Sequence, residues 1–338
     1  MRRIKPICIT MGEPSGVSGE IIIKIWNERK KKKILPFFVY DDPSRLRKIS
    51  EYLQLKIPIK KINDESESLD LFEDFLPVKS LESQIDFKLG QPNYLNSKHV
   101  LDSINKAVKS ALESKVRAII TSPVCKKMLL KYGFKFSGQT EYISNLVSKI
   151  KQKEFNEIMI LSTTKPIDKS RNLIVGLLTT HVPLKNVSKI ITPDLLIRKT
   201  MSFEKTLKKI WKIKNPKIGV CSFNPHVGEY GLVGREEKDI IIPTIEKLKK
   251  RINICGPLSP DSCFSMFTRI KFDGFICIYH DQALIPIKTL DFLNSVNITG
   301  GLPITRVSPD HGPAFDIARL KKADISSMLA SINLLKHI

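Results

Sequence analysis

The sequence predicts an α/β protein with a largely parallel sheet, and three observations support this fold class. Short apolar runs typical of buried strands alternate along the chain with longer segments of helical periodicity. The first apolar run leads through a glycine-rich turn at 11–19 directly into a helical segment. The length of 338 residues exceeds the usual size of one domain, so we expect two domains.

The elements of the first half follow from these patterns. The pattern over 96–114 is the clearest, because apolar residues from Val100 to Leu112 recur at helical spacing. The basic run at 29–33 is expected to end a surface helix, and the acidic, irregular stretch 60–98 is expected to be peripheral. The predicted order is strand 6–10, helix 21–26, strand 34–40, helix 96–114, strand 117–123 and helix 141–150.

The second half continues the alternation. Its predicted elements are strands at 157–163, 173–180, 217–223 and 274–279, with a helix at 236–251 between the last two. Ligands of parallel sheets bind beyond the carboxyl ends of the strands. The residues that follow each predicted strand are therefore the first candidates for a functional site.

Charge and composition exclude several classes of protein. The net charge is +22, but the lysines are spread along the chain without zinc-finger spacing or an RNA-binding aromatic signature, so we expect no nucleic-acid partner. A positive field would still attract a phosphorylated substrate. No apolar run reaches membrane-span length and no signal-peptide pattern is present, so we expect no membrane partner and a cytoplasmic location. The six cysteines lack CxxC spacing, which predicts free thiols.

Three of the six histidines follow apolar, strand-like runs. They are His181, His226 and His280. Neutral imidazoles suit zinc and similar divalent ions. The spacing between the three matches no short metal motif, so the pattern alone leaves a shared metal and unrelated structural roles equally open.

A second set of residues could bind anions. Thr140 opens a predicted helix, where its hydroxyl and the free backbone N–H groups could receive a phosphate. Helix capping by Thr140 and solvation of the cations are the simpler alternatives. Arg306 lies between Pro303 and Pro309, in a predicted rigid loop where a solvated arginine has little need to be. A functional role is therefore favoured for Arg306 and for Lys288.

Taken in order, nine segments resemble the 4-hydroxythreonine-4-phosphate dehydrogenase family of pyridoxal phosphate biosynthesis. Several are weak alone, but nine in the same order are hard to obtain by chance. The last also resembles the adenosine-binding loop of isocitrate and isopropylmalate dehydrogenases. The segments are TMGEPSGVSGE (10–20), TSPVCK (121–126), GQTEY (138–142), TTHVPL (179–184), NPHVGEYGLVGREE (224–237), GPLSPDSCF (256–264), YHDQALIPIKTL (279–290), VNITGGLP (296–303) and SPDHGPAFDIA (308–318).

The resemblance implies an isocitrate/isopropylmalate dehydrogenase-like fold of two α/β domains with an active-site cleft between them. It implies a first domain at 1–125 plus 293–338, which carries the adenosine-binding loop. The second domain, at 126–292, would carry the metal ligands and the dimer contacts. A homodimer with shared active sites, and metal ligands drawn from both subunits, is implied as well.

The implied reaction is the NAD- or NADP-dependent, metal-assisted oxidation of 4-phosphooxy-L-threonine to 2-amino-3-oxo-4-phosphooxybutanoate. That product loses carbon dioxide to give 3-amino-2-oxopropyl phosphate. One zinc, magnesium or cobalt ion is implied for each active site. The implied roles are metal ligation by His181, His226 and His280; catalysis by Asp281 and Lys288; substrate binding by Gln139, Thr140, Asp261, Asp281, Lys288, Asn297 and Arg306; and cofactor binding by His311, Gly312, Ala314 and Asp316.

The chain departs from the family's pattern at several positions. Gln139 stands where the family has histidine, and an amide can donate a hydrogen bond but cannot shuttle a proton. Ala283 stands where the family has glycine, which matters if that position needs a positive φ. The other departures are Ser18 and Gly19 for Gly-Pro, Gly300 for leucine, Pro313 for threonine and Arg319 for glycine.

Two other functions fit parts of the pattern. Histidines with lysine and arginine around a phosphate would also serve a metal-dependent phosphatase or hydrolase of a small phosphorylated metabolite. A non-catalytic basic protein that binds nucleic acid is the second alternative, and the set of three strand-end histidines argues against it.

Overall fold

The structure is a computed structural model that describes residues 5–167 and 172–337. By its internal contacts the chain forms two compact units. Unit 1 comprises residues 1–153 and 303–336, and unit 2 comprises 154–302 with the last two residues. The domain boundaries expected from the sequence, after 125 and after 292, stay a prediction; by contact, 126–153 group with unit 1 and 293–302 with unit 2.

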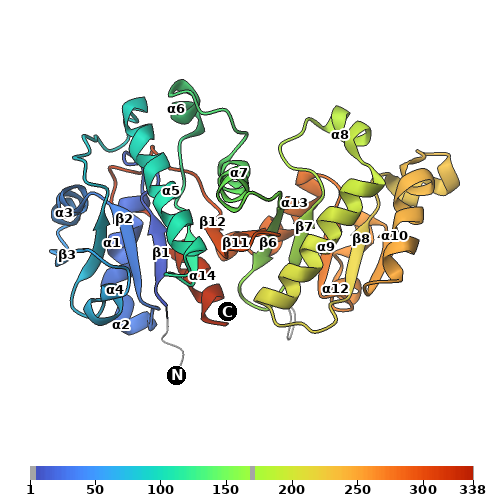
Figure 1. The fold of residues 1–338 in the computed structure, drawn as a ribbon. Helices are drawn as coiled ribbons and strands as arrows, with labels where there is room; N and C mark the ends of the chain where they lie inside the picture. Colours follow the sequence, from blue (N-terminus) through green and yellow to red (C-terminus); the bar gives the residue numbers. More distant parts are fainter. Residues whose placement is uncertain (1–4, 168–171, 338) are drawn as a thin grey trace. The chain divides into compact units, whose positions relative to one another are not determined.

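Unit 1 alternates strands and helices, as its sequence predicts (Figure 1). Helix starts follow local chemistry: the Asp42 side chain accepts a bond from the Ser44 N–H at 2.8 Å, with Pro43 in the first turn. The elements are β1 (Ile7–Thr10), α1 (Ser18–Asn27), α2 (Arg29–Lys32), β2 (Phe37–Asp41), α3 (Pro43–Tyr52), β3 (Ile59–Ile62), α4 (Glu67–Leu71), β4 (Leu76–Ser80), η1 (Tyr94–Asn96), α5 (Ser97–Leu112), β5 (Ala118–Ile120), α6 (Lys126–Lys131), α7 (Gln139–Lys151), β12 (Arg306–Pro309), α14 (Ser326–Leu334) and η4 (Leu335–His337).

The sheet of unit 1 has the strand order β3-β4-β2-β1-β5-β12, and every pair is parallel. The register pairs Thr10 with Tyr40 and Ile9 with Ile120. The residues after β1, β2 and β5 therefore emerge at one edge of the sheet, where a parallel sheet places its ligands. The stretch predicted to be peripheral instead contributes β3 and β4, and the β4 residues Leu76 and Val78 are fully buried.

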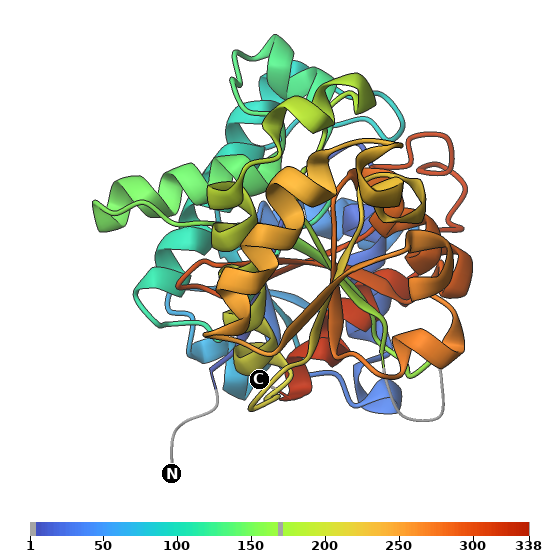
Figure 2. The same cartoon turned by 90° about the vertical axis from the view of Figure 1, so that its right-hand side faces the viewer.

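Unit 2 has its own sheet and helices, and its yellow-to-orange segments face the viewer in Figure 2. Helices α9 and α13 both contact β6 and β7, and α10 contacts β9. The elements are β6 (Ile158–Thr163), β7 (Ile174–Leu177), α8 (Leu184–Ile190), α9 (Pro193–Ile210), β8 (Ile218–Cys221), η2 (Pro225–Gly231), η3 (Glu237–Ile241), α10 (Ile242–Lys249), β9 (Ile254–Leu258), α11 (Pro260–Cys263), α12 (Met266–Arg269), β10 (Gly274–Cys277), α13 (His280–Leu290) and β11 (Ser295–Gly300).

The sheet of unit 2 has the order β11-β6-β7-β10-β8-β9. Strand β6 runs antiparallel to both neighbours, and the other pairs are parallel. The prediction of a largely parallel α/β protein is therefore confirmed, with β6 as the exception. The segments after β7, β8, β9 and β10 carry His181, His226, Asp261 and His280 respectively.

Two composition-based expectations can be compared with the structure. Each of the six cysteines is a free thiol, as predicted. Within the described ranges, no helix combines the length and apolar character that crossing a membrane requires.

Candidate functional site

The N-terminus of α7 in unit 1 lies in contact with Arg306. The helix begins after Gly138, which as a glycine has no side chain to cap the first N–H groups. Arg306 is 3% exposed; its Nε donates to Thr121 Oγ1 at 2.9 Å and its Nη1 to Thr140 Oγ1 at 3.1 Å. A hydroxyl that accepts such a bond keeps its own proton to donate. Free helix N–H groups, a guanidinium and this hydroxyl together suit a phosphate or carboxylate.

The charge state of Arg306 fits this role. Burial lowers the pKa of its guanidinium to about 10, and the nearby Glu141 carboxylate acts in the opposite direction. Arg306 therefore remains protonated at neutral pH. The expectation of a loop at this position is wrong, because Arg306 is the first residue of β12 and is buried beneath the surface.

Gln139 lies in the same cluster, but part of its side chain is already engaged. Its Nε2 donates to the backbone carbonyl of Ser122 at 3.2 Å. Its buried Oε1 has no hydrogen-bond partner within the described parts of the chain. Because an amide nitrogen carries two hydrogens, one N–H remains for a ligand.

His181 and His280 come together in unit 2. Their ring centroids lie 5.9 Å apart, and both line a pocket of ≈ 260 Å³ with Tyr279 and Asp281. The distance between His280 Nδ1 and Asp281 Oδ1 is 2.7 Å. A carboxylate that accepts the Nδ1 proton leaves the Nε2 lone pair of the imidazole available to a metal. The two histidines therefore fit the donor set of a divalent ion.

His226 lies apart from this pair. Residues 226–230 all have φ between 43° and 74°, so they form a left-handed turn that we call the arm, η2 with its flanks at 224–234. His226 lines a different pocket, of ≈ 450 Å³, and its charge influences Asp261. Among the described residues of one chain, no three His, Cys, Asp or Glu side chains are arranged to hold a metal. The prediction of a shared triad stays open for an assembly of two chains.

The arm is anchored at its base by Glu237. The Oε1 atom of this buried carboxylate accepts from the backbone N–H groups of Phe223 and Asn224 at 2.7 and 2.8 Å. Its Oε2 accepts from Asn224 Nδ2 at 2.8 Å and lies 2.9 Å from where a Cβ on Gly228 would stand. A left-handed conformation is disfavoured in ordinary L-residues by about 1–2 kcal/mol each, so the arm depends on these bonds for its shape.

Of the remaining expected substrate residues of unit 2, two line a third pocket and two do not. Asp261 and Asp281 both line this pocket of ≈ 470 Å³. Hydrogen bonding from the Ser259 side chain lowers the pKa of the exposed Asp261. Lys288, in α13, places Nζ 4.7 Å from the ring centroid of Phe292. Asn297 lies in β11, where its buried Oδ1 is unpartnered by any described residue.

The segment 311–316 in unit 1 has features that fit a nucleotide. His311 Nδ1 lies 2.9 Å from the Gly312 carbonyl, so in the neutral ring Nε2 is an acceptor, and this buried atom lacks a partner in the described chain. Ala314 has a φ of 50°, and Asp316 is exposed. The Val17 N–H donates to the Pro313 carbonyl at 3.0 Å, which joins this segment to the glycine-rich loop.

Several departures from the family pattern have structural explanations. Ala283 is fully buried inside α13 in ordinary helical conformation, so a positive φ is not needed there. A Cβ on Gly300 would collide with Thr206 Oγ1. Arg319 donates through Nε to the Leu89 carbonyl at 2.7 Å, and its own carbonyl accepts from Tyr52. Gly19 leaves room for Ile49 and Arg45, whose atoms would lie 2.5 and 3.1 Å from a Cβ at that position.

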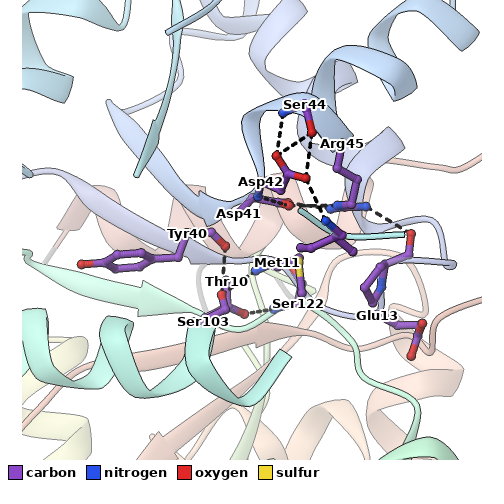
Figure 3. A network of polar contacts seen from close by, with 12 residues as sticks. Thr10, Met11, Glu13, Tyr40, Asp41, Asp42, Ser44, Arg45, Ser103 and Ser122 are labelled. Atoms are coloured by element: carbon purple, nitrogen blue, oxygen red, sulfur yellow. Dashed lines mark hydrogen bonds and ion pairs between the residues drawn. The ribbon is translucent and has the colours of Figure 1, made fainter. Parts of the chain in front are cut away.

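Sequence reasoning missed a buried network beside the glycine-rich loop (Figure 3). Arg45 and Asp41 are both fully buried and form an ion pair at 2.5 Å. Burial also raises the pKa of Glu13, which Arg45 partly opposes. The available signal was the spacing of Asp41 and Arg45 across the start of a helix, four residues apart, which suits an ion pair.

The described geometry is that of an α/β protein with a buried arginine at a helix N-terminus and a pocket lined by two histidines, and comparisons with known proteins give its family. The family model "Pyridoxal phosphate biosynthetic protein PdxA" matches residues 33–335. The 4-hydroxythreonine-4-phosphate dehydrogenase of Zymomonas mobilis is 37% identical over 97% of this chain and 94% of its own length. That of Erythrobacter litoralis is 36% identical over 97% and 95%. The chain belongs to the PdxA family, and its curated relatives carry the name of an oxidoreductase.

Solved structures agree with this assignment. The crystal structure of 4-hydroxythreonine-4-phosphate dehydrogenase from Klebsiella pneumoniae has a TM-score of 0.84 and 31% identity, and the match covers 98% of this chain and 99% of that one. A terephthalate 1,2-cis-dihydrodiol dehydrogenase from Burkholderia xenovorans, at 20% identity and a TM-score of 0.64, shares the fold over 99% of this chain and 98% of its own. The family resemblance read from the nine segments is therefore confirmed.

Proposed function

We propose that the protein oxidises the C3 hydroxyl of 4-phosphooxy-L-threonine with NAD or NADP. The product, 2-amino-3-oxo-4-phosphooxybutanoate, is a β-keto acid and loses carbon dioxide to give 3-amino-2-oxopropyl phosphate. A bound nicotinamide dinucleotide would accept the hydride from C3, and the hydroxyl proton would be released. The cytoplasmic location expected from the sequence stays a prediction.

The observation that carries the proposal is the anion site at α7 in a chain of this family. A phosphate there would receive charge-assisted bonds from the buried Arg306 and hydrogen bonds from Thr140 and the helix N-terminus. Burial strengthens these bonds, because water competes less for the phosphate oxygens. The resemblance adds Lys288, Asp261 and Asn297 as further substrate contacts.

His181, His280 and His226 would hold one zinc, magnesium or cobalt ion. When bound, such an ion supplies Lewis acidity at the hydroxyl that is oxidised. Asp281 fixes the tautomer of His280 and so keeps its Nε2 lone pair free. On the cofactor side, His311 offers an unpartnered acceptor, and Asp316 is exposed to interact with a ribose hydroxyl.

A homodimer would complete the histidine set. The described part of one chain supplies His181 and His280 in one pocket, but His226 lies elsewhere on the arm. The arm also presents apolar side chains to solvent: Tyr230 is 99% exposed and Leu232 is 85% exposed. Large exposed apolar side chains that gather on one element are typical of an interface. We propose that a second copy of the chain receives the arm, and that His226 thereby reaches the His181–His280 pocket of that copy.

The direct test is an NAD reduction assay with 4-phosphooxy-L-threonine. We expect NADH to form at 340 nm only when substrate, NAD and a divalent ion are all present, and chelation to abolish it. Re-addition of zinc, magnesium or cobalt should restore the rate. Release of inorganic phosphate without NADH would contradict the proposal and support a metal-dependent phosphatase.

Replacement of Gln139 by histidine tests the role of this departure from the family. Because Gln139 donates to Ser122 and keeps one N–H for the anion site, we expect a phosphate contact rather than proton transfer. Gln139→His should lower KM for the phosphorylated substrate several-fold, since a protonated imidazole adds a charged bond worth about 1 kcal/mol more than a neutral one. KM should also become pH-dependent near the histidine pKa, while kcat stays within a few-fold. A hundredfold gain in kcat would instead identify a missing general acid–base catalyst.

A further inference from the structure

Arg45 is the largest fully buried side chain of the described chain, and its guanidinium has two different partners. Its Nε and Nη2 donate to the two carboxylate oxygens of Asp41 at 2.9 and 2.5 Å. Its Nη1 donates to the backbone carbonyl of Pro14 at 3.1 Å. The guanidinium thus connects the end of β2 to the glycine-rich loop that follows β1.

Four hydrogen bonds to neighbouring segments hold the glycine-rich loop in place. Of these four, the bond from Arg45 is the one that involves a charged group. The Glu13 N–H donates to the Pro123 carbonyl at 2.8 Å, the Ser15 carbonyl accepts from the Gly90 N–H at 2.8 Å, and the Val17 N–H donates to the Pro313 carbonyl at 3.0 Å. The fourth is the bond from Arg45 to Pro14. The loop therefore bridges the sheet edge to the segment that carries His311 and Asp316.

The glycine-rich loop and Pro313 of the segment 311–316 are closely packed. A Cβ on Gly16 would lie 2.6 Å from the Pro313 carbonyl oxygen, so the two backbones are in direct contact. Gly12 has a φ of 71°, and a Cβ there would lie 2.6 Å from Ser122 Cβ and 2.7 Å from Ser18 Oγ. Buried hydroxyls of Ser15, Ser18 and Ser122 remain without a hydrogen-bond partner among the residues described. A displacement of Pro14 would therefore be transmitted to Pro313, because Gly16 touches the Pro313 backbone and Val17 is hydrogen-bonded to it.

A fully buried ion pair contributes little net free energy to the stability of a fold. Desolvation of both charges offsets most of their attraction, and apolar replacements are often as stable. Burial raises the pKa of Asp41, and Arg45 opposes that shift. The planar guanidinium binds the Asp41 carboxylate on one side and the Pro14 carbonyl on the other. An apolar pair could not make these bonds.

We propose that Arg45 is a positioning residue for the nicotinamide dinucleotide. Held by Asp41, it fixes the loop Gly12–Val17, and the loop sets the position of the cofactor-binding segment 311–316. This inference rests on the proposed function for the identity of the cofactor. It assigns to Arg45 no contact with substrate, metal or cofactor.

The test uses the full-length protein and a paired substitution that leaves no buried charge unmatched. In Asp41→Asn/Arg45→Met the asparagine still accepts the Asp42 N–H, which donates to Asp41 Oδ1 at 2.7 Å in the native chain. We expect the Kd for NAD, measured by calorimetry without substrate, to rise about tenfold, as expected for a small displacement of a binding segment. KM for the phosphorylated substrate should stay within about twofold and Tm within a few degrees. Arg45→Lys keeps the positive charge but loses the forked geometry of the guanidinium. Its Kd for NAD should lie between those of the native protein and the paired variant.

The control is Arg47→Met, which removes an exposed arginine of the same helix and should leave NAD affinity unchanged. An unchanged Kd for NAD in the folded paired variant overturns the inference. A parallel loss of NAD affinity, substrate affinity and Tm also overturns it, because that pattern marks a general structural role. If the native protein binds NAD but forms no NADH from 4-phosphooxy-L-threonine, the proposed reaction fails while the role of Arg45 is still decided by the binding data.

Discussion

Two inactive variants, His226→Ala and His280→Ala, are expected to restore activity to each other when both chains share one dimer. Under the proposed assembly, one site of the mixed dimer combines His181 and His280 from the first chain with His226 from the second. That site is intact, and the other has lost two ligands. The mixed dimer should therefore show about half the native rate, since a two-fold symmetric dimer has two equivalent sites.

Each variant alone should lose about 10³-fold in kcat, because Lewis-acid stabilisation worth several kcal/mol is removed. Co-expression with two affinity tags and purification on both tags would isolate mixed dimers for an NADH assay. The matched control pairs His181→Ala with His280→Ala, which lie in the same pocket with ring centroids 5.9 Å apart. This second mixture should stay inactive. Equal recovery in both mixtures, or a monomeric native protein, would contradict the assignment of His226 to the partner.

Removal of the Arg306 guanidinium should have the second-largest effect. Arg306→Met is expected to raise KM for the phosphorylated substrate about 10²-fold, because the charge-assisted bonding proposed between this buried guanidinium and the phosphate is lost. The KM for NAD should change little. Arg306→Lys should recover part of the affinity, since an ammonium keeps the charge but cannot contact Thr121 and Thr140 as a planar fork.

Removal of Arg306 also takes a nearby cation away from the Glu141 carboxylate, which complicates this measurement. Burial lowers the pKa of Arg306 and the Glu141 carboxylate opposes this shift, so without the guanidinium the buried Oε2 of Glu141 would lose a compensating charge. The double variant Arg306→Met/Glu141→Gln removes this complication, and thermal unfolding would confirm that it folds. If KM for the substrate stays at the native value in the folded double variant, Arg306 does not bind the phosphate.

The fold class could be predicted because its signals are local. Apolar runs and helical spacing are set by residues close in sequence, so β5, α5, β8 and β10 all fall within their predicted ranges. The misassigned stretch 60–98 shows the limit of this reasoning. Its strands β3 and β4 are short and mixed in polarity, and their pairing with each other and with β2 is a tertiary interaction.

In the candidate site, too, local sequence signals were predictive and tertiary contacts were not. The histidines were found because they follow strands, whereas the left-handed arm that carries His226 depends on Glu237, eleven positions further on. No propensity predicts such a turn, because most of its residues are disfavoured in that conformation. Arg306 was assigned to a loop because prolines flank it, yet Pro309 ends a strand whose pairing with β5 overrides that local signal. The i,i+4 spacing of Asp41 and Arg45 indicated their ion pair, but the bond from Arg45 to the Pro14 carbonyl joins segments that meet only in the folded chain.

The neighbours of Gly300 restrict which substitutions this sequence can accept during evolution. The family's leucine cannot return there alone, because Thr206 occupies the space and its hydroxyl is held by the Ser202 carbonyl at 2.7 Å. Atoms of Ile158 and Ile160 would also lie 2.9 Å from a Cβ at this position. A leucine at 300 is therefore acceptable only after its neighbours have become smaller, and a smaller neighbour beside glycine leaves a cavity. A leucine at 300 and a smaller residue at 206 are therefore each deleterious when introduced alone. The two positions should be inherited together, and chimaeras that take residues 300 and 206 from different parents should be selected against.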